Sequence, residues 1–183
     1  IFLSTSGLSR RMAQKGAKEL ATMVSDRLPN PNEAYGTLFI TRKDSPINSL
    51  EDMQGHSLVA NLKGGFYGHQ IGLGELVKQG YDPYTFFSSV HYVGRDLKKV
   101  VNAVISGKAD VGSVSSCFLE DTYPKDGEVW KNLKGIGLKP NATGCLASTD
   151  LYPNWSVSTM PTAEPAVARK AAEALLAMPK AEG

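Results

Sequence analysis

The sequence lacks the features that would place it in several large classes of protein. It contains no apolar run near the roughly 18 residues that cross a bilayer as a helix. Neither sign of charge is in excess, with 20 basic and 18 acidic residues among 183, so no electrostatic signature of nucleic-acid binding is present. A hydrophobic fraction of 42% and a charged fraction of 21% are ordinary for globular proteins and exclude a mainly disordered chain.

Cysteine and histidine are also scarce. Two cysteines, Cys117 and Cys145, are too few for a disulfide scaffold. Three scattered histidines make no metal-ligand spacing, so we expect no metal and no cofactor. The cysteines leave three alternatives open: two separately buried side chains, a redox pair, or thiols that react with an oxidising ligand. No motif supports an enzyme with Cys117 as nucleophile and His91 as base, and we expect no catalysis.

What the sequence does contain is an alternation of strand and helix patterns. Apolar residues at helical spacing over 96–106 (DLKKVVNAVIS) predict an amphipathic helix. The other expected helices are 8–15, 66–78, 116–123 and 163–178, and the expected strands are 2–5, 19–24, 35–41, 58–60, 86–92, 109–114, 133–138 and 143–147. In the last helix, Val167, Ala171, Leu175 and Met178 should be buried. Such alternation predicts an α/β fold with a mostly parallel sheet covered on both faces.

We expect two α/β lobes. Residues 46–135 form a complete lobe, and residues 1–45 and 136–183 form the other, so the chain crosses between lobes twice. The first lobe has a single convincing helix before the crossing, and Ile1 is neither a start methionine nor part of a charged signal-peptide region. We therefore expect a fragment whose first lobe is truncated at its N-terminus.

Residues 47–60 (INSLEDMQGHSLVA) predict a capped turn followed by a short buried strand. Ser49 and Asp52 have the spacing of a capping box, and Gly55 ends the turn. The residues after this strand are glycine-rich and lead into a helix. A strand, a glycine loop and a helix N-terminus in this order are typical of sites that receive small anions.

The glycine loop supplies the first candidate ligand-binding residues. Gly64 and Gly65 permit positive φ, so their amides can point at an anion, and Phe66 or Tyr67 can form an apolar wall. The remaining candidates lie at or just after the ends of strands, where ligands of open α/β sheets bind: Ser4, Thr5, Ser6, Arg95, Asp96, Ser115 and Ser116. Arg95 can hold an oxyanion bidentately, whereas Asp96 and Ser116 are each expected to cap a helix.

Four segments resemble the type II periplasmic binding proteins, three of them the phosphonate-binding branch. Residues 49–58 (SLEDMQGHSL) are similar to the S-L-x-D-L-x-G-K-x-V segment that opens the second lobe of this fold. The other three are 80–87 (GYDPYTFF), similar to G-x-D-P-x-x-x-F; 100–112 (VVNAVISGKADVG), similar to V-x-A-V-x-x-G-x-A-D-V-G; and 148–155 (STDLYPNW), similar to S-T-x-L-Y-P-x-W. The last motif is typical of sensor domains of bacterial histidine kinases, tetrathionate sensors among them.

The resemblance implies a type II periplasmic-binding-protein fold, two lobes joined by a double crossover that close over a small ligand, usually an anion. It implies a periplasmic sensor domain whose membrane helix and kinase modules lie outside this sequence. The alternative is a solute-binding protein of an ABC transporter for phosphonate, phosphite or another small oxyanion. A homodimer of the full-length receptor stays an open expectation.

This chain departs from the family at two places that contact ligand. Residues 63–66 (KGGF) replace a hydroxyl-rich Ser-Thr-Ser-Gly loop, and residues 94–96 (GRD) replace a Ser-His-Asp. Without those hydroxyl donors, the identity of the ligand stays open.

Overall fold

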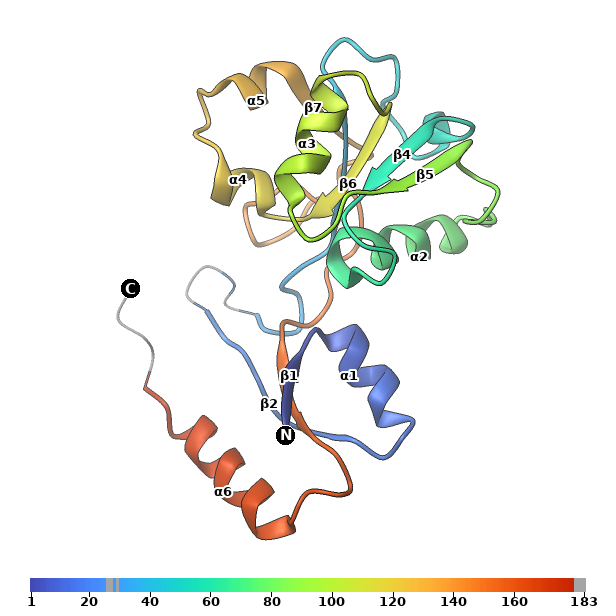
Figure 1. Cartoon of the computed structure of the whole chain (residues 1–183). Coiled ribbons are helices and arrows are strands. Elements are labelled where there is room, and N and C mark those ends of the chain that lie inside the picture. The colour runs from blue at the N-terminus through green and yellow to red at the C-terminus, as the bar shows by residue number, and fades with distance from the viewer. Residues whose placement is uncertain (26–27, 29, 180–183) are drawn as a thin grey trace. The chain divides into compact units, whose positions relative to one another are not determined.

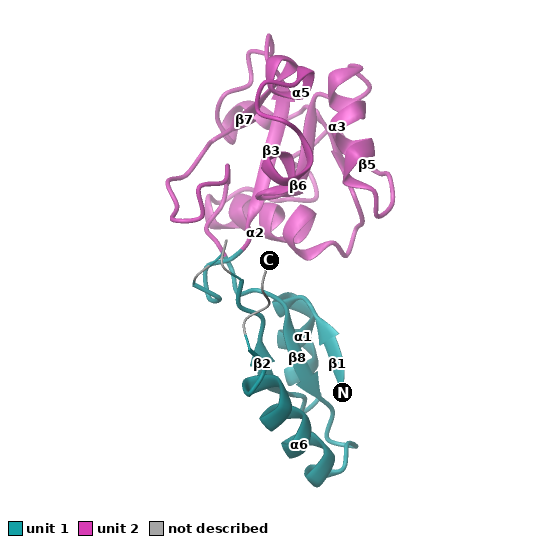
Figure 2. Ribbon diagram, turned by 90° about the vertical axis from the view of Figure 1, so that its left-hand side faces the viewer, with its two compact units in different colours: residues 1–34, 152–183 teal, residues 35–151 magenta. Residues whose placement is uncertain are grey.

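A computed structural model describes residues 1–25, 28 and 30–179, and its chain divides into two compact units (Figures 1 and 2). Unit 1 comprises residues 1–34 and 152–183, and unit 2 comprises residues 35–151. Residues 35–45 and 136–151, which the sequence pattern placed in the first lobe, therefore belong to unit 2. The reason is that β3 (Thr37–Arg42) is hydrogen-bonded into the sheet of unit 2.

Unit 2 is built on a five-stranded sheet in the order β5-β4-β6-β3-β7. In chain order, the elements that follow β3 are η1 (Glu51–Met53), β4 (Ser57–Ala60), η2 (Phe66–Gln70), α2 (Ile71–Lys78), β5 (Ser89–Tyr92), α3 (Leu97–Ile105), β6 (Val111–Ser115), α4 (Phe118–Thr122), α5 (Glu128–Asn132) and β7 (Leu133–Ile136).

The directions of these strands qualify the expectation of a mostly parallel sheet. β4 runs parallel to β5 and β6, whereas β3 runs antiparallel to both β6 and β7. β3 is thus inserted against the direction of the other strands. The pattern of apolar residues could not reveal this, because a buried strand has the same pattern whether it runs parallel or antiparallel to its neighbours.

The expected strand 143–147 is wrong, because these residues form turns and irregular structure. Asn141 Oδ1 accepts hydrogen bonds from the N–H and Oγ1 of Thr143 at 3.0 and 2.6 Å, and Gly144 has a φ of +70°. This local side-chain bonding competes with a sheet ladder.

The core of unit 2 lies on both faces of its sheet. Because side chains alternate along a strand, Leu38 and Ile40 of β3 enter one apolar cluster and Phe39 the other. α3 covers the first face, where Val104 is fully buried, and α2 covers the second with Leu76. The amphipathic helix predicted at 96–106 is confirmed as α3 (Leu97–Ile105).

Unit 1 contains β1 (Phe2–Ser4), α1 (Ser6–Ala13), β2 (Lys18–Thr22), β8 (Ser156–Thr159) and α6 (Pro165–Leu176). β8 lies between β1 and β2 and is antiparallel to both. Buried hydroxyls, rather than apolar side chains, join α1 to this sheet: Ser9 Oγ lies 2.8 Å from Ser4 Oγ and from Ser156 Oγ, and 3.2 Å from Ser158 Oγ.

The predicted burial of the last helix is wrong. No residue of α6 is buried, and Val167 and Met178 are 50% and 67% exposed. Helical spacing of apolar residues identifies which face of a helix can be buried. It does not show whether another part of the protein packs against that face.

Candidate ligand site at the carboxyl end of the parallel strands

The carboxyl ends of β5, β4 and β6 lie side by side in unit 2 (Figure 1). Ala60, the last residue of β4, pairs with Tyr92 of β5 and with Ser113 of β6. Past the strand ends, Gly94 N–H donates to the Asn61 carbonyl at 2.9 Å. This edge is where open α/β sheets receive ligands.

The glycine loop leads from β4 into η2, a turn of π-helix that continues directly into α2. Two hydroxyls from the sheet hold its first turn. Thr37 Oγ1 donates to the Tyr67 carbonyl and Ser113 Oγ donates to the Gly68 carbonyl, each at 2.6 Å. π-turns are rare and occur frequently at functional sites, and here the helix start is fixed to the sheet beside the strand ends.

Gly64 and Gly65 lack the positive φ that was expected of them, and contact of Gly64 with a ligand stays a prediction. The N–H of Gly65 already donates to the Leu62 carbonyl at 2.9 Å. Space, rather than φ, requires glycine at 65, because a Cβ there would collide with Oδ1 of Asn61.

Two polar atoms at this edge are buried and have no hydrogen-bond partner within the described residues: Oδ1 of Asn61 and Nδ1 of His69. His69 is 2% exposed, and its Nε2 lies 3.1 Å from Oη of Tyr92. Neither Asn61 nor His69 is among the candidates predicted from the sequence. When a single polar residue follows a strand or lies within a helical pattern, the sequence does not indicate whether its side chain is buried.

The unfolding free energy should depend on pH through His69. Burial disfavours the imidazolium and lowers the pKa of His69 from 6.5 to about 4. As the pH falls from 6.5 to 4, the unfolded chain takes up a proton that the folded chain does not. The stability is therefore complete above pH 6.5 and decreases through this window, by about 3 kcal/mol. Urea titrations at several pH values measure the unfolding free energy across this window.

In His69→Gln the unfolding free energy should change much less between pH 6.5 and 4. The same pH dependence in the variant and the unaltered protein would contradict the attribution to His69.

Asp96 caps a helix, as predicted. It is the N-cap of α3, and its Oδ1 accepts a hydrogen bond from Lys98 N–H at 3.0 Å. Arg95 lies between Asp96 and Gly94, whose φ is +88°, and its side chain is exposed. A role of Arg95 in ligand binding stays a prediction.

Ser116 does not cap a helix, so that prediction is wrong. It is buried, and it exchanges two hydrogen bonds with Gly36: its Oγ accepts from the Gly36 N–H and its N–H donates to the Gly36 carbonyl, each at 2.9 Å. α4 begins later, with Cys117 as its N-cap. Ser115 is partly exposed and, by strand alternation, lies on the same face as Ser113, which contacts η2.

The three candidates of unit 1 lie around the start of α1. Ser4 is buried in the hydroxyl cluster, and Thr5 is the N-cap of α1 but makes no side-chain capping bond. Ser6 Oγ donates to the Pro153 carbonyl at 2.8 Å. The hydroxyls of Ser4 and Ser6 are thus engaged inside unit 1.

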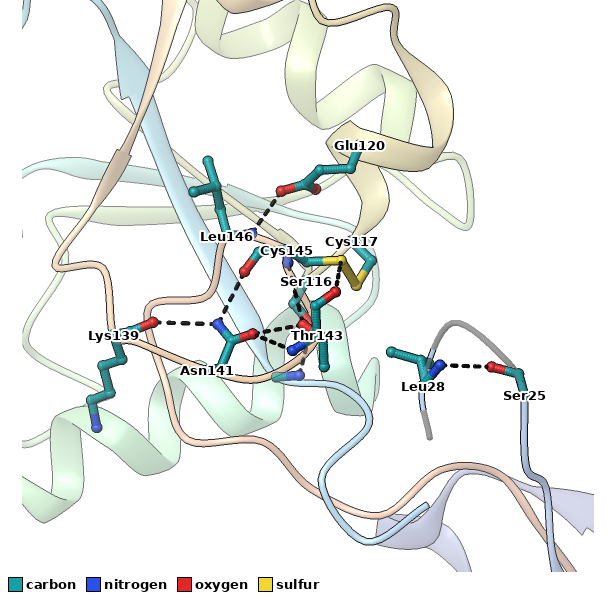
Figure 3. Close-up of a disulfide and its surroundings, with 11 residues drawn as sticks. Ser25, Leu28, Ser116, Cys117, Glu120, Lys139, Asn141, Thr143, Cys145 and Leu146 are labelled. Atoms are coloured by element: carbon teal, nitrogen blue, oxygen red, sulfur yellow. Dashed lines mark hydrogen bonds between the residues drawn. A yellow bond between two sulfur atoms is a disulfide. The ribbon is translucent and has the colours of Figure 1, made fainter. Parts of the chain in front are cut away.

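Of the alternatives for the cysteines, the structure contains the pair: Cys117 and Cys145 form a disulfide (Figure 3). Both are buried, at 1% and 5% exposure, and Cys117 has a left-handed φ of +66°. Beside the disulfide, Glu120 Oε1 accepts a hydrogen bond from Leu146 N–H at 2.6 Å. These contacts attach residues 137–151, here called the return segment, to the start of α4.

Within residues 1–25, 28 and 30–179, no group of three or more His, Cys, Asp or Glu side chains is arranged to hold a metal ion. In the same residues, no helix has the length and apolarity needed to cross a membrane.

The fold is that of the type II periplasmic binding proteins. The binding-protein component of an ABC phosphonate transporter from Pseudomonas aeruginosa superposes with a TM-score of 0.61 at 17% identity, over 95% of this chain and 55% of that chain. XAC2383 from Xanthomonas citri, bound to chloride ion, gives a TM-score of 0.75 at 22% identity, over 95% of this chain and 61% of that chain.

The family model of the periplasmic substrate-binding protein of phosphonate ABC transporters matches residues 2–183. The chain belongs to this family, whose members bind solutes and are not enzymes. Among curated proteins, the tetrathionate sensor histidine kinase TtrS of Salmonella typhimurium is 27% identical over 150 residues, or 82% of this chain. The chain spans 25% of the length of that kinase.

Proposed function

We propose that this chain is the extracytoplasmic sensor domain of a transmembrane histidine kinase and that it binds a small anionic solute. The observation that carries the proposal is the match to the tetrathionate sensor kinase, which covers 82% of this chain. Phosphoryl transfer would then belong to other segments of the kinase, and this chain would supply the ligand-dependent signal.

The carboxyl edge of β4, β5 and β6 has properties that suit an anion. η2 and α2 form a continuous helix over residues 66–78, and its N-terminus carries partial positive charge at this edge. The rings of Phe66 and Tyr67, whose centroids are 5.1 Å apart, lie in its first turn. Arg95 is exposed nearby on the loop that follows β5. We propose Phe66, Tyr67, Arg95 and Ser115 as the ligand-contacting residues of unit 2.

A second candidate is the solute-binding protein of an ABC transporter for phosphonate, phosphite or another oxyanion. The description of the matching family favours it. The two candidates differ in the gene that encodes the chain. An encoded membrane helix and kinase modules after residue 183 would support the sensor, and a stop codon would support the transport protein.

A thermal-shift screen of the purified chain tests anion binding. The panel contains tetrathionate, thiosulfate, phosphite, methylphosphonate and small carboxylates. An anion at about a hundred times its dissociation constant should stabilise the fold by roughly 2.7 kcal/mol, which raises the melting temperature.

Arg95→Ala tests the site, and it should reduce the rise in melting temperature caused by the anion. Lys125→Ala is the control, because it removes an exposed cation elsewhere on unit 2. A folded protein that responds to no anion in the panel would contradict the proposed ligand class.

A further inference from the structure

His69 and Tyr92 form a hydrogen-bonded pair at the carboxyl edge of the sheet. His69 comes from η2 and Tyr92 is the last residue of β5. Nε2 and Oη are 3.1 Å apart, and the rings meet edge to face with centroids 5.3 Å apart. His69 is 2% exposed, whereas Tyr92 is 43% exposed. The pair therefore connects a buried imidazole to a phenol ring that reaches the surface.

The direction of this hydrogen bond follows from the other nitrogen of the imidazole. Nδ1 of His69 is buried and meets no hydrogen-bonding atom in the part of the chain that the structure describes. A buried N–H without an acceptor is rarer in proteins than a buried acceptor without a donor, so the proton belongs on Nε2. Nε2–H then donates to Oη of Tyr92, and the hydroxyl proton of Tyr92 is left to donate elsewhere.

Burial keeps both members of the pair uncharged near neutral pH. Desolvation lowers the pKa of His69 to about 4 and raises the pKa of Tyr92 above its usual 10.0. Tyr92 thus presents a neutral hydroxyl whose orientation is set from behind by a neutral imidazole.

We propose that the Tyr92 hydroxyl donates a hydrogen bond to an oxygen of a bound oxyanion, and that His69 is the positioning residue that orients it. This inference rests on the proposed function and adds a neutral donor to that site. Tyr92 is suitably placed because it pairs with Ala60 at the end of β4, one residue before Asn61 and the glycine loop. A preoriented hydroxyl loses little freedom when it binds, which is why such donors contribute to affinity.

Tyr92→Phe tests the contact, since it keeps the ring and removes only the hydroxyl. The 183-residue chain is titrated calorimetrically with tetrathionate and, separately, with methylphosphonate. The dissociation constant of whichever anion binds should rise roughly tenfold or more. Tyr84→Phe is the matched control, because Tyr84 is 88% exposed, and it should bind as the unaltered chain does. Unaltered affinity in Tyr92→Phe would overturn the contact.

The positioning role is tested by two variants at 69. His69→Leu should weaken binding as Tyr92→Phe does, whereas His69→Gln, whose amide N–H can donate to Tyr92, should keep most of the affinity. Equal losses in both variants would overturn the positioning role.

Nitrogen-15 NMR of His69 provides a readout that needs no ligand. The Nε2–H tautomer is expected at neutral pH, and an Nδ1–H tautomer would overturn the inference whether or not an anion binds. If neither anion binds the unaltered chain, the proposed function and the Tyr92 contact both fail for those anions, and the tautomer spectrum still tests separately whether His69 orients the hydroxyl.

Discussion

Replacing Phe39 with alanine should lower the free energy of unfolding of unit 2 by about 3–5 kcal/mol. Phe39 is 1% exposed and lies in β3, between β6 and β7. Its ring fills the apolar cluster under α2. Gly72 of α2 lies directly against it, since a Cβ at 72 would be 2.6 Å from Cζ of Phe39. Removing the ring therefore deletes a large buried surface and leaves a cavity in a tightly packed region.

Urea denaturation followed by fluorescence measures this loss. Tyr84→Ala is the control, because it removes an aromatic ring of similar size that is 88% exposed, and it should change stability by no more than about 0.5 kcal/mol. A Phe39→Ala variant as stable as the control would mean that the cluster under α2 does not hold the sheet together.

The elements that the sequence predicted well are those in which local pattern and tertiary environment agree. The helix at 97–105 has apolar residues on one face, and that face meets the sheet. The capping box is confirmed as well: Asp52 Oδ2 accepts from Ser49 N–H at 2.9 Å, and Asp52 N–H donates to Ser49 Oγ at 3.2 Å. Both features are decided within a few residues, so the sequence was sufficient for them.

The features that sequence reasoning missed depend on contacts between distant residues. Ser116 was expected to cap the next helix but bonds Gly36, which lies 80 residues away in sequence. His69 is hydrogen-bonded to Tyr92, which lies 23 residues later. Gly65 differs, because the group that leaves no room for a Cβ there is the side chain of Asn61, only four residues earlier, whereas the sequence pointed to a positive φ. One sequence shows that a position is constrained and does not show which distant group imposes the constraint.

Removing the disulfide should lower the unfolding free energy by about 3–4 kcal/mol. Cys117 and Cys145 are 28 residues apart in sequence, and a cross-link over a loop of this length restricts the unfolded chain by about that amount in the chain-entropy model. For this test both cysteines are replaced by alanine rather than by serine. Both sites are buried, and an unpaired serine hydroxyl there would be destabilising in its own right.

The measurement compares urea denaturation with and without dithiothreitol. The reductant should destabilise the unaltered protein to the level of the double-alanine variant and leave the variant unchanged. A double-alanine variant as stable as the unaltered protein would show that the cross-link does not limit the unfolded chain. The periplasm, where this family of proteins acts, is a compartment in which such a bond persists.

The return segment should stay on unit 2 after the disulfide is removed, because other bonds attach it independently. Ser148 Oγ accepts from Phe39 N–H at 2.9 Å and donates to the Ile136 carbonyl at 2.6 Å. Lys139 Nζ lies 2.8 Å from Oε1 of Glu75, a side chain 5% exposed on α2. These bonds act in the folded state, whereas the disulfide acts mainly on the unfolded chain. The double-alanine variant should therefore be less stable yet keep the native fold at low urea, with its circular dichroism spectrum unchanged.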